Sequence, residues 1–522
     1  MPTKHFIIAT LSILLSCVYF LNITHAQNPT NFIVVLVDDL GAHDLSYAGS
    51  LFHETPNIDR LADRGTVFTS GYAACAVCSP TRAALQTGKS PARLGITDWI
   101  RGRFQGGKQP ILKDGEWPYV QDVKNGLFTP QNPVQMELSE ITIAERLKEH
   151  GYATCYVGKW HLGSEGFHPD NQGYDENIGG CDLGQPPSYF DPYLPGSTET
   201  KAGNPDENPL YRISTLSPRQ PGEFLTDREA AEAVSFMSRN LESGKPFYLQ
   251  VANYAVHTPV MGKTSAVEYF REKKQLMAEA DPSLLNPFLD DLGEPDAATQ
   301  TAPRQRNAVY AALVQSVDDA LGRILAGVEE FGLSENTIII FTSDNGGYCG
   351  MTDNFPLRSG KGTPYEGGIR VPWIIYVPES LQNTSVSVCD TPISTYDILP
   401  TVLDFADIPL SDDERKSQEI EGVSLRPLLA GESSDFHRDS LFWHFPHYRA
   451  GIPPYSIIRK GDWKLIRFYT PAGDKWELYH LKDDPRELQD VAENEKEIAQ
   501  ELLAELDAWL KDSGARMPRK TP

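Results

Sequence analysis

Four runs of consecutive apolar residues recur along the chain, and a cluster of polar residues follows each of them. Unbroken apolar runs rich in Val, Ile and Phe are typical of strands that are buried on both faces of a parallel sheet. The runs predict strands over residues 31–37, 152–157, 246–251 and 336–341. The polar clusters are therefore expected at the ends of these strands.

Helical periodicity lies between the predicted strands. It predicts helices over residues 142–150, 227–241 and 304–331, each with a glycine soon after its last periodic residue, as is common at helix ends. Strands that alternate with helices predict an α/β fold in which a large, mostly parallel sheet is sandwiched by helices. Ligands bind such sheets beyond the carboxyl ends of the strands, so the four polar clusters should lie close together.

After about residue 435 the pattern changes to short segments separated by turn residues. They predict a small C-terminal antiparallel sheet with strands over residues 440–444, 455–459, 463–468 and 476–481. A terminal amphipathic helix is expected from Asn494, a suitable N-cap, to Leu510. We therefore divide the chain into residues 1–26, a large α/β domain over 27–434 and a small α+β subdomain over 435–522.

Residues 1–26 have the features of a secretory signal peptide, with a positive charge at Lys4 and an apolar stretch over residues 6–21. The stretch is short for a membrane span, and no later run reaches the roughly 20 apolar residues of a spanning helix. Cys17 lies in a segment that loosely resembles a lipoprotein box, but the apolar run continues past it, which favours cleavage over lipid anchoring. We expect an exported protein, periplasmic or extracellular, without a transmembrane segment.

The charge balance limits the possible partners. The chain has 522 residues, with 71 Asp and Glu against 47 Lys and Arg, and a formal net charge of −24. A nucleic acid is held by a basic face, so this balance argues against a nucleic-acid partner.

Cysteine usage directs attention to Cys78. Six cysteines follow residue 26, which is too few for a disulfide scaffold in a chain of this length. Cys75 and Cys78 form a C-x-x-C pair, but no second pair or nearby histidines complete a zinc site. Cys78 starts the segment 78–82, whose Pro80 suits the first turn of a helix, and a helix N-terminus attracts anions. Taken alone, the segment is better explained by a buried structural cysteine.

Four oxygen-bearing side chains follow two of the predicted strands, namely Asp38, Asp39, Asp344 and Asn345. Carboxylate and amide oxygens are hard ligands, which suit Ca²⁺ better than zinc or copper. Any one of these residues can also simply cap a turn. Two such pairs together favour a metal site.

Several of these motifs together resemble the active site of the type I sulfatases. Cys78, Pro80 and Arg82, followed by residues 86–88, resemble the C-x-P-x-R signature of that family. The other resembling elements are Asp38 and Asp39, residues 158–163 with Lys159 and His161, His257 to Pro259, Asp344 and Asn345, and Lys361. They stand in the family's order, from about Asn31 to the C-terminal region. The resemblance implies an alkaline-phosphatase-like fold, with residues 27–434 as the catalytic sulfatase domain.

The resemblance also implies the cofactors. In this family the cysteine is oxidised to formylglycine (3-oxoalanine), which implies that a formylglycine-generating enzyme or an anaerobic sulfatase-maturating enzyme acts on Cys78. One Ca²⁺ ion would be held by Asp38, Asp39, Asp344, Asn345 and the modified Cys78.

The same resemblance implies a role for each basic residue. One hydroxyl of the hydrated aldehyde at Cys78 would attack the sulfur of a sulfate ester, and His257 or Lys361 would protonate the leaving alcohol. His161 would then deprotonate the second hydroxyl and so release sulfate. Lys159, Lys361 and Arg82 would neutralise the sulfuryl oxygens.

The substrate is expected to be a sulfated carbohydrate, from a glycosaminoglycan or an algal polysaccharide, because export and acidity suit an enzyme that acts outside the cell. The long segments 185–221 and 281–296 are predicted to be loops that wall a cleft. Asp98, Trp99, Arg101 and Arg103 offer a ring platform, an acceptor for hydroxyl groups and cations for neighbouring sulfates or uronates. His444 and His447 are candidates for a second wall, and an interdomain surface is the alternative for both groups.

Two other functions stay open at this point. A phosphodiesterase or phosphonate hydrolase of the same superfold is one, although alkaline-phosphatase types hold two zinc ions with more histidines than this site offers. An inactive protein that binds sulfated glycans is the other. It would require the loss of a key residue, and no element of the motif is missing.

Overall fold

The computed structural model describes residues 29–102, 109–110, 116–121, 126–204, 212–280, 305–382, 386–449 and 451–520. The predicted signal peptide with Cys17, the predicted loop at 281–296 and Arg103 lie outside the described residues.

A mixed sheet of eight strands forms the centre of the large domain, in the order β11-β2-β10-β9-β1-β8-β6-β7. The four strands expected from the sequence are β1 (Asn31–Val37), β6 (Ala153–Gly158), β8 (Phe247–Ala252) and β9 (Thr337–Ser343). They are neighbours and run parallel, with β1 between β8 and β9 and β6 beside β8. The remaining strands are β2 (Thr66–Phe68), β7 (Glu176–Ile178), β10 (Trp373–Tyr376) and β11 (Val388–Cys389), of which β10 is antiparallel to both its neighbours. The predicted mostly parallel sheet is confirmed.

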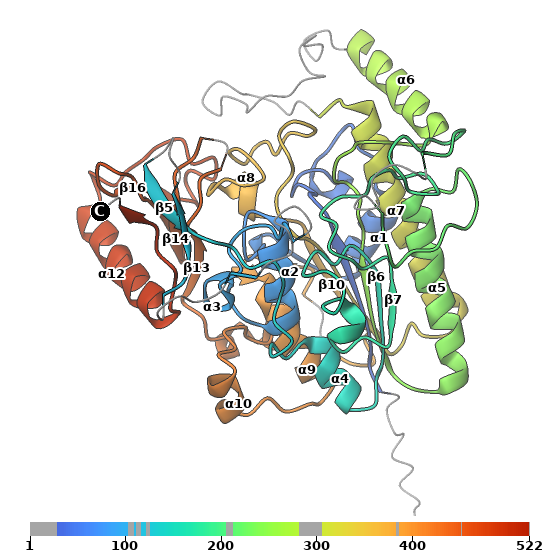
Figure 1. The fold of residues 1–522 in the computed structure, drawn as a ribbon, viewed down its shortest axis with the longest axis horizontal. Helices are drawn as coiled ribbons and strands as arrows, with labels where there is room; N and C mark the ends of the chain where they lie inside the picture. The colour runs from blue at the N-terminus through green and yellow to red at the C-terminus, as the bar shows by residue number, and fades with distance from the viewer. Residues whose placement is uncertain are drawn as a thin grey trace, which may run out of the picture.

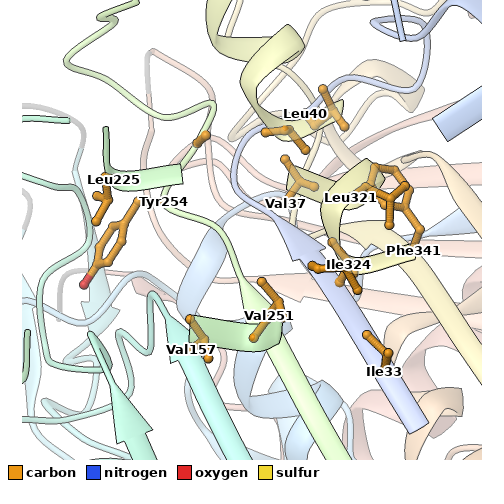
Figure 2. Close-up of a cluster of buried hydrophobic side chains, with 14 of the residues drawn as sticks. Ile33, Val37, Leu40, Val157, Leu225, Val251, Tyr254, Leu321, Ile324 and Phe341 are labelled. Carbon is orange, nitrogen blue, oxygen red and sulfur yellow. The ribbon is translucent and has the colours of Figure 1, made fainter. Parts of the chain in front are cut away.

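Helices cover both faces of this sheet because successive side chains of its strands point to opposite sides. Ile33, Val35 and Val37 of β1 pack on one face with α1 (Pro56–Arg64), α5 (Leu225–Ser243) and α7 (Ala308–Glu330). Phe32, Val34 and Leu36 pack on the other with α2 (Cys78–Thr87), α4 (Ile143–Glu149) and α9 (Ile398–Phe405). The layers are visible in Figure 1, and Figure 2 shows Leu321 and Ile324 of α7 beside Val37 and Phe341 of the sheet.

The C-terminal subdomain is an antiparallel sheet in chain order with one helix, as expected, and lies at one end of the molecule (Figure 1). Its elements are β13 (Ser440–Phe445), β14 (Tyr455–Lys460), β15 (Trp463–Phe468), β16 (Lys475–His480) and α12 (Lys496–Asp512). The N-cap of α12 is Glu495, so the prediction of Asn494 as N-cap is wrong. Asn494 instead lies in the preceding turn, where its N–H donates to the Val491 carbonyl over 2.9 Å.

Shorter elements complete the described part of the chain. A three-stranded sheet joins β4 (Tyr119–Gln121) and β5 (Leu127–Pro130) to β17 (Arg519–Lys520), and β3 (Gly71–Tyr72) pairs with β12 (Ile393–Ser394). The other α-helices are α3 (Pro91–Leu94), α6 (Thr264–Ala280), α8 (Glu366–Ile369), α10 (Asp412–Ser417) and α11 (Arg426–Leu429). Short 3-10 helices span Ser46–Ala48, Pro169–Asn171, Thr395–Asp397 and Ser433–Asp435. Among the described residues, no helix is long and apolar enough to cross a membrane.

A buried ion cluster joins the subdomain to the large domain. Lys464 of β15 places its Nζ 2.9 Å from Glu366 Oε1, at the start of α8, and 2.8 Å from Glu487 Oε1. All three side chains are buried. Burial opposes ionisation of Glu366, but Lys464, Arg459 and Arg370 together outweigh it and lower the pKa to about 2, whereas burial raises the pKa of Glu487 to about 7.

We predict that Lys464→Met destabilises the protein by roughly 3 kcal/mol, because removing one partner of a buried ion pair leaves charge without compensation. Chemical denaturation followed by fluorescence measures the change. Lys460→Met is the matched control, since Lys460 meets Glu501 and Glu505 at the surface, and its midpoint should stay close to that of the parent. Equal midpoints for the parent and Lys464→Met would contradict the prediction.

Candidate active site

The nucleophile candidate lies at the start of a buried helix, as the sequence predicts. α2 begins at Cys78, Pro80 stands in its first turn, and all of its residues are buried. Cys78 is free and 3% exposed. The neighbouring Ser79 donates a hydrogen bond of 2.9 Å from its hydroxyl to the His161 carbonyl, which ties the start of α2 to the loop after β6.

The polar residues that follow the four central strands meet at one edge of the sheet. Val37 of β1 is in register with Ser343 of β9, so Asp38 and Asp344 emerge side by side. The ligand atoms of Asp38, Cys78 and Asp344 all lie within 4.8 Å of one another, and so do those of Asp38, Asp39 and His257. The convergence expected from a parallel sheet therefore brings the carboxylates to the cysteine.

Two buried oxygen atoms of this cluster accept no hydrogen bond from the described residues. Asp38 Oδ1 and Asn345 Oδ1 are buried and have no hydrogen-bond partner among the described residues. The Asn345 amide is oriented, because its Nδ2 donates to Asp39 Oδ1 over 2.8 Å and to the Gly346 carbonyl over 3.0 Å. Buried acceptors that lack donors, all of them oxygen, fit a hard cation such as Ca²⁺.

Three cations balance the three carboxylates. Arg82 places Nε 2.8 Å from Asp344 Oδ2, Lys159 places Nζ 2.7 Å from Asp38 Oδ2, and Lys361 donates to Asp39 Oδ1. Burial raises the pKa of Asp38, whereas at Asp39 the attraction of Lys361, His257 and Lys159 together outweighs burial and lowers the pKa. The carboxylates in turn outweigh burial and raise the pKa values of Arg82 and Lys361, which keeps both cations charged.

His161 is buried and His257 is half-buried, and this loss of hydration lowers the pKa of His257 to about 3 and that of His161 well below its ordinary value. His161 Nε2 lies 2.9 Å from the Ile100 carbonyl, an acceptor, so this nitrogen carries the proton. His161 Nδ1 is buried and has no partner among the described residues. Neutral His161 thus offers a free lone pair. His257 Nδ1 lies 2.8 Å from the Thr258 carbonyl, and its Nε2 lies 3.6 Å from Asp39 Oδ2.

A cavity of about 450 Å³ opens onto this cluster. Its described lining consists of Val77, Cys78, Trp99, His161, residues 183–187, His257, Lys361 and Arg449. Of these, residues 185–187 belong to the segment 185–221 in which a wall loop was expected. Gly184 packs directly on His161, since a Cβ there would lie 2.5 Å from the imidazole Cε1.

The predicted catalytic residues fall into two groups. Cys78, His161, His257 and Lys361 line the cavity. Arg82 and Lys159 are 1% and 0% exposed and are not among the residues that line the cavity; they contact the buried carboxylates instead. The two groups meet through the carboxylates, and Arg82 also donates from Nη1 to the Lys159 carbonyl over 2.6 Å.

The predicted substrate-binding residues separate in the same way. Trp99 lines the cavity, and the Arg101 guanidinium lies over its ring at 3.9 Å. Asp98 accepts from the Trp99 N–H over 2.8 Å and does not itself line the cavity.

His444 and His447 do not line the cavity either. His444 bonds to Ser456 over 2.8 Å within the subdomain, and His447 bonds to Thr97 of the large domain over 2.8 Å; both histidines are buried. The interdomain alternative therefore describes His447, whereas His444 lies inside the subdomain, and neither is among the described residues that line the cavity. Sequence reasoning missed Arg449, for which nothing but its closeness to His447 gave a signal.

This chain is similar to known sulfatases in sequence. The sulfatase family profile matches residues 30–408, and that of the C-terminal part of N-sulphoglucosamine sulphohydrolase matches residues 360–513. A sulfatase of Formosa agariphila is 30% identical, over 93% of this chain and 89% of its own length. Human arylsulfatase A is 30% identical over 85% of this chain and 75% of its own.

A solved structure, that of Ps i-CgsB, is similar over 93% of both chains, with a TM-score of 0.72 and 27% identity. The same protein in complex with k-i-k-neocarrahexaose gives a TM-score of 0.71. Family profile, relatives and fold agree with the cluster around Cys78. The chain belongs to the sulfatase family and is a sulfuric ester hydrolase.

Proposed function

We propose that this sulfatase removes sulfate esters from a sulfated carbohydrate and that its nucleophile is an aldehyde residue made from Cys78. The observation that carries the proposal is the cluster of Asp38, Cys78 and Asp344, whose ligand atoms lie within 4.8 Å of one another and in which Cys78 lines the cavity. A maturating enzyme, formylglycine-generating or anaerobic, would oxidise Cys78 to 3-oxoalanine. When hydrated, that residue supplies two hydroxyls, one for attack on sulfur and one for the release of sulfate.

The residues that would hold a Ca²⁺ ion are Asp38, Asp39, Asp344 and Asn345, together with the modified residue 78. When bound, the ion would lower the pKa of a neighbouring hydroxyl and offset negative charge on the sulfate. The acceptors Asp38 Oδ1 and Asn345 Oδ1, which lack donors, support this assignment.

Around the nucleophile, His161 is the base that takes the proton of the second hydroxyl, since its Nδ1 is unpartnered and its pKa is low. Lys361 lines the cavity and stays charged, so it faces the sulfuryl oxygens. Lys159 and Arg82 act indirectly, because their ion pairs hold Asp38 and Asp344 in place. Either Lys361 or His257 hands a proton to the leaving alcohol, because both line the cavity and both contact Asp39. Lys361 already carries its proton, whereas His257 is neutral in the free enzyme and would gain one beside the bound sulfate anion, which favours the charged imidazole.

A carbohydrate substrate is supported by the cavity and by the relatives. The cavity is within the usual volume range for organic ligands and presents the Trp99 ring, a surface on which a sugar can stack. Among the relatives are N-acetylgalactosamine-6-sulfatase of dog, at 31% identity over 78% of this chain, and the neocarrahexaose complex. The residue pattern at positions 1–26 supports export to the periplasm or beyond the cell.

We predict that peptide mass across residue 78 shows the aldehyde in protein produced with a maturating enzyme, and that this protein releases sulfate from sulfated oligosaccharides. Cys78→Ala should lose this activity by a factor of at least about 10⁴, because it removes the one cysteine in the cluster of described residues from which the aldehyde can be made. Cys389→Ala, which changes a cysteine in the edge strand β11, should keep it. Aldehyde together with turnover of phosphate esters and no release of sulfate would contradict the proposal.

We predict that removal of Ca²⁺ by a chelator abolishes sulfate release and that added Ca²⁺ restores it. Ca²⁺ at 100 times its dissociation constant should stabilise the fold by about 2.7 kcal/mol. Thermal unfolding with and without the ion measures this effect. Asp344→Asn should lose the Ca²⁺-dependent shift, and the exposed Asp63→Asn should keep it. A chelated enzyme that retains full activity would refute the metal assignment.

We predict that His257→Gln discriminates between leaving groups. An alkoxide needs a proton to leave, so kcat/KM for a sugar sulfate should fall about 100-fold or more, whereas 4-nitrophenyl sulfate should lose less than about tenfold. The exposed His437→Gln serves as the control, and Lys361→Met is measured beside it. Equal losses on both substrates in His257→Gln would assign the proton transfer to another residue.

A further inference from the structure

Arg449 is a cavity-lining cation that lies outside the residues that carry the chemistry. It comes from the connection between β13 and β14, where its backbone pairs with Ile452 through hydrogen bonds of 3.2 and 2.8 Å. The subdomain thus sends one charged side chain into the cavity of the large domain.

The path of the Arg449 side chain is built into the fold. It crosses the backbone at Gly362, where a Cβ would lie 2.2 Å from Arg449 Nε and 2.4 Å from Cδ. Gly362 follows Lys361. The Gly362 N–H donates to the carbonyl of Ala76, two residues before Cys78, over 2.8 Å. A residue with a side chain at position 362 would displace Arg449, so this glycine makes room for the arginine.

The Arg449 guanidinium keeps its hydrogen-bond donors available. Its closest carboxylate is Asp98, with Nη1 and Oδ1 4.0 Å apart, beyond hydrogen-bond distance. Asp98 Oδ1 accepts instead from the Trp99 N–H over 2.8 Å. Within the described parts of the chain, no acceptor bonds to this guanidinium, although its side chain is only 27% exposed. Lys361, by contrast, is committed to Asp39.

These features match the recognition of an anion beside the scissile sulfate. A guanidinium presents a planar fork of donors that binds the oxygens of a sulfate or carboxylate in pairs. Trp99, in the same cavity and held by Arg101, provides a surface for the sugar ring between the two anions. A cavity of about 450 Å³ holds more than a sulfate group.

We propose that Arg449 recognises a second anionic group, a sulfate or a carboxylate, on the sugar that carries the scissile sulfate or on the sugar next to it. This inference rests on the proposed function. It makes Arg449 a specificity residue, and it makes doubly anionic oligosaccharides the substrate class.

Calorimetric titration of the full chain in Ca²⁺ tests the proposal, with Cys78→Ala as the parent so that nothing is turned over. One matched pair of probes is neocarrabiose with one or with two sulfates. The other is the chondroitin 6-sulfate disaccharide with its uronate intact or reduced to the alcohol. The two pairs separate a sulfate from a carboxylate as the second anion.

The parent should bind the doubly anionic member of at least one pair about 10- to 100-fold more tightly, as expected for charge-assisted hydrogen bonds. Adding Arg449→Met should bring that affinity ratio to within about threefold of unity, and Arg449→Lys should retain part of it. Arg239→Met, which removes a surface charge paired with Glu176, should leave the ratio as it is. Melting curves of each variant check that the fold is intact.

A ratio that survives in Arg449→Met, or a parent that binds no doubly anionic probe more tightly than its partner, overturns the proposal. The titration needs neither the aldehyde nor turnover. Its failure therefore leaves the nucleophile assignment in place, and a failure of sulfate release leaves the titration result in place.

Discussion

Three buried carboxylates at one sheet edge are the constraint on which the site depends. Asp38, Asp39 and Asp344 are shielded from water, and like charges in such an interior repel one another strongly. Their stability requires compensating cations, which the chain supplies from α2, from the loop after β6 and from the loop before α8. Arg82, Lys159 and Lys361 are thereby drawn to the same point from distant parts of the sequence.

The C-terminal subdomain packs against the segments that carry the site. One face of its sheet packs on residues 72–77, the segment that leads into Cys78, and Trp443 donates to the Ala73 carbonyl over 2.8 Å. The Lys464 cluster fixes Glu366, a few residues after Lys361. The subdomain therefore holds both the segment before Cys78 and the loop that carries Lys361. These contacts explain why the subdomain is part of the catalytic unit, and is not an independent domain.

The sequence predicted the parts of this structure that local patterns determine. Apolar runs located the four central strands, and the geometry of parallel sheets then placed Asp38, Lys159, His257 and Asp344 at one edge. Contacts between remote segments were not predictable in this way. The return of β17 to β5, the bond from His447 to Thr97 across the interface and the entry of Arg449 into the cavity follow from packing between remote segments. None of them leaves a periodic signal in the chain.

The central claim is that the oxygen atoms beside residue 78 bind a cation, and that the modified residue 78 binds the same cation. A crystal structure of the matured protein in Ca²⁺, with anomalous data to identify the ion, tests that claim most directly. The account predicts an ion about 2.3–2.6 Å from oxygens of Asp38, Asp39, Asp344 and Asn345, with an aldehyde or its hydrate at position 78 among the ligands. An intact thiol at that position, with no ion between the four side chains, would contradict it.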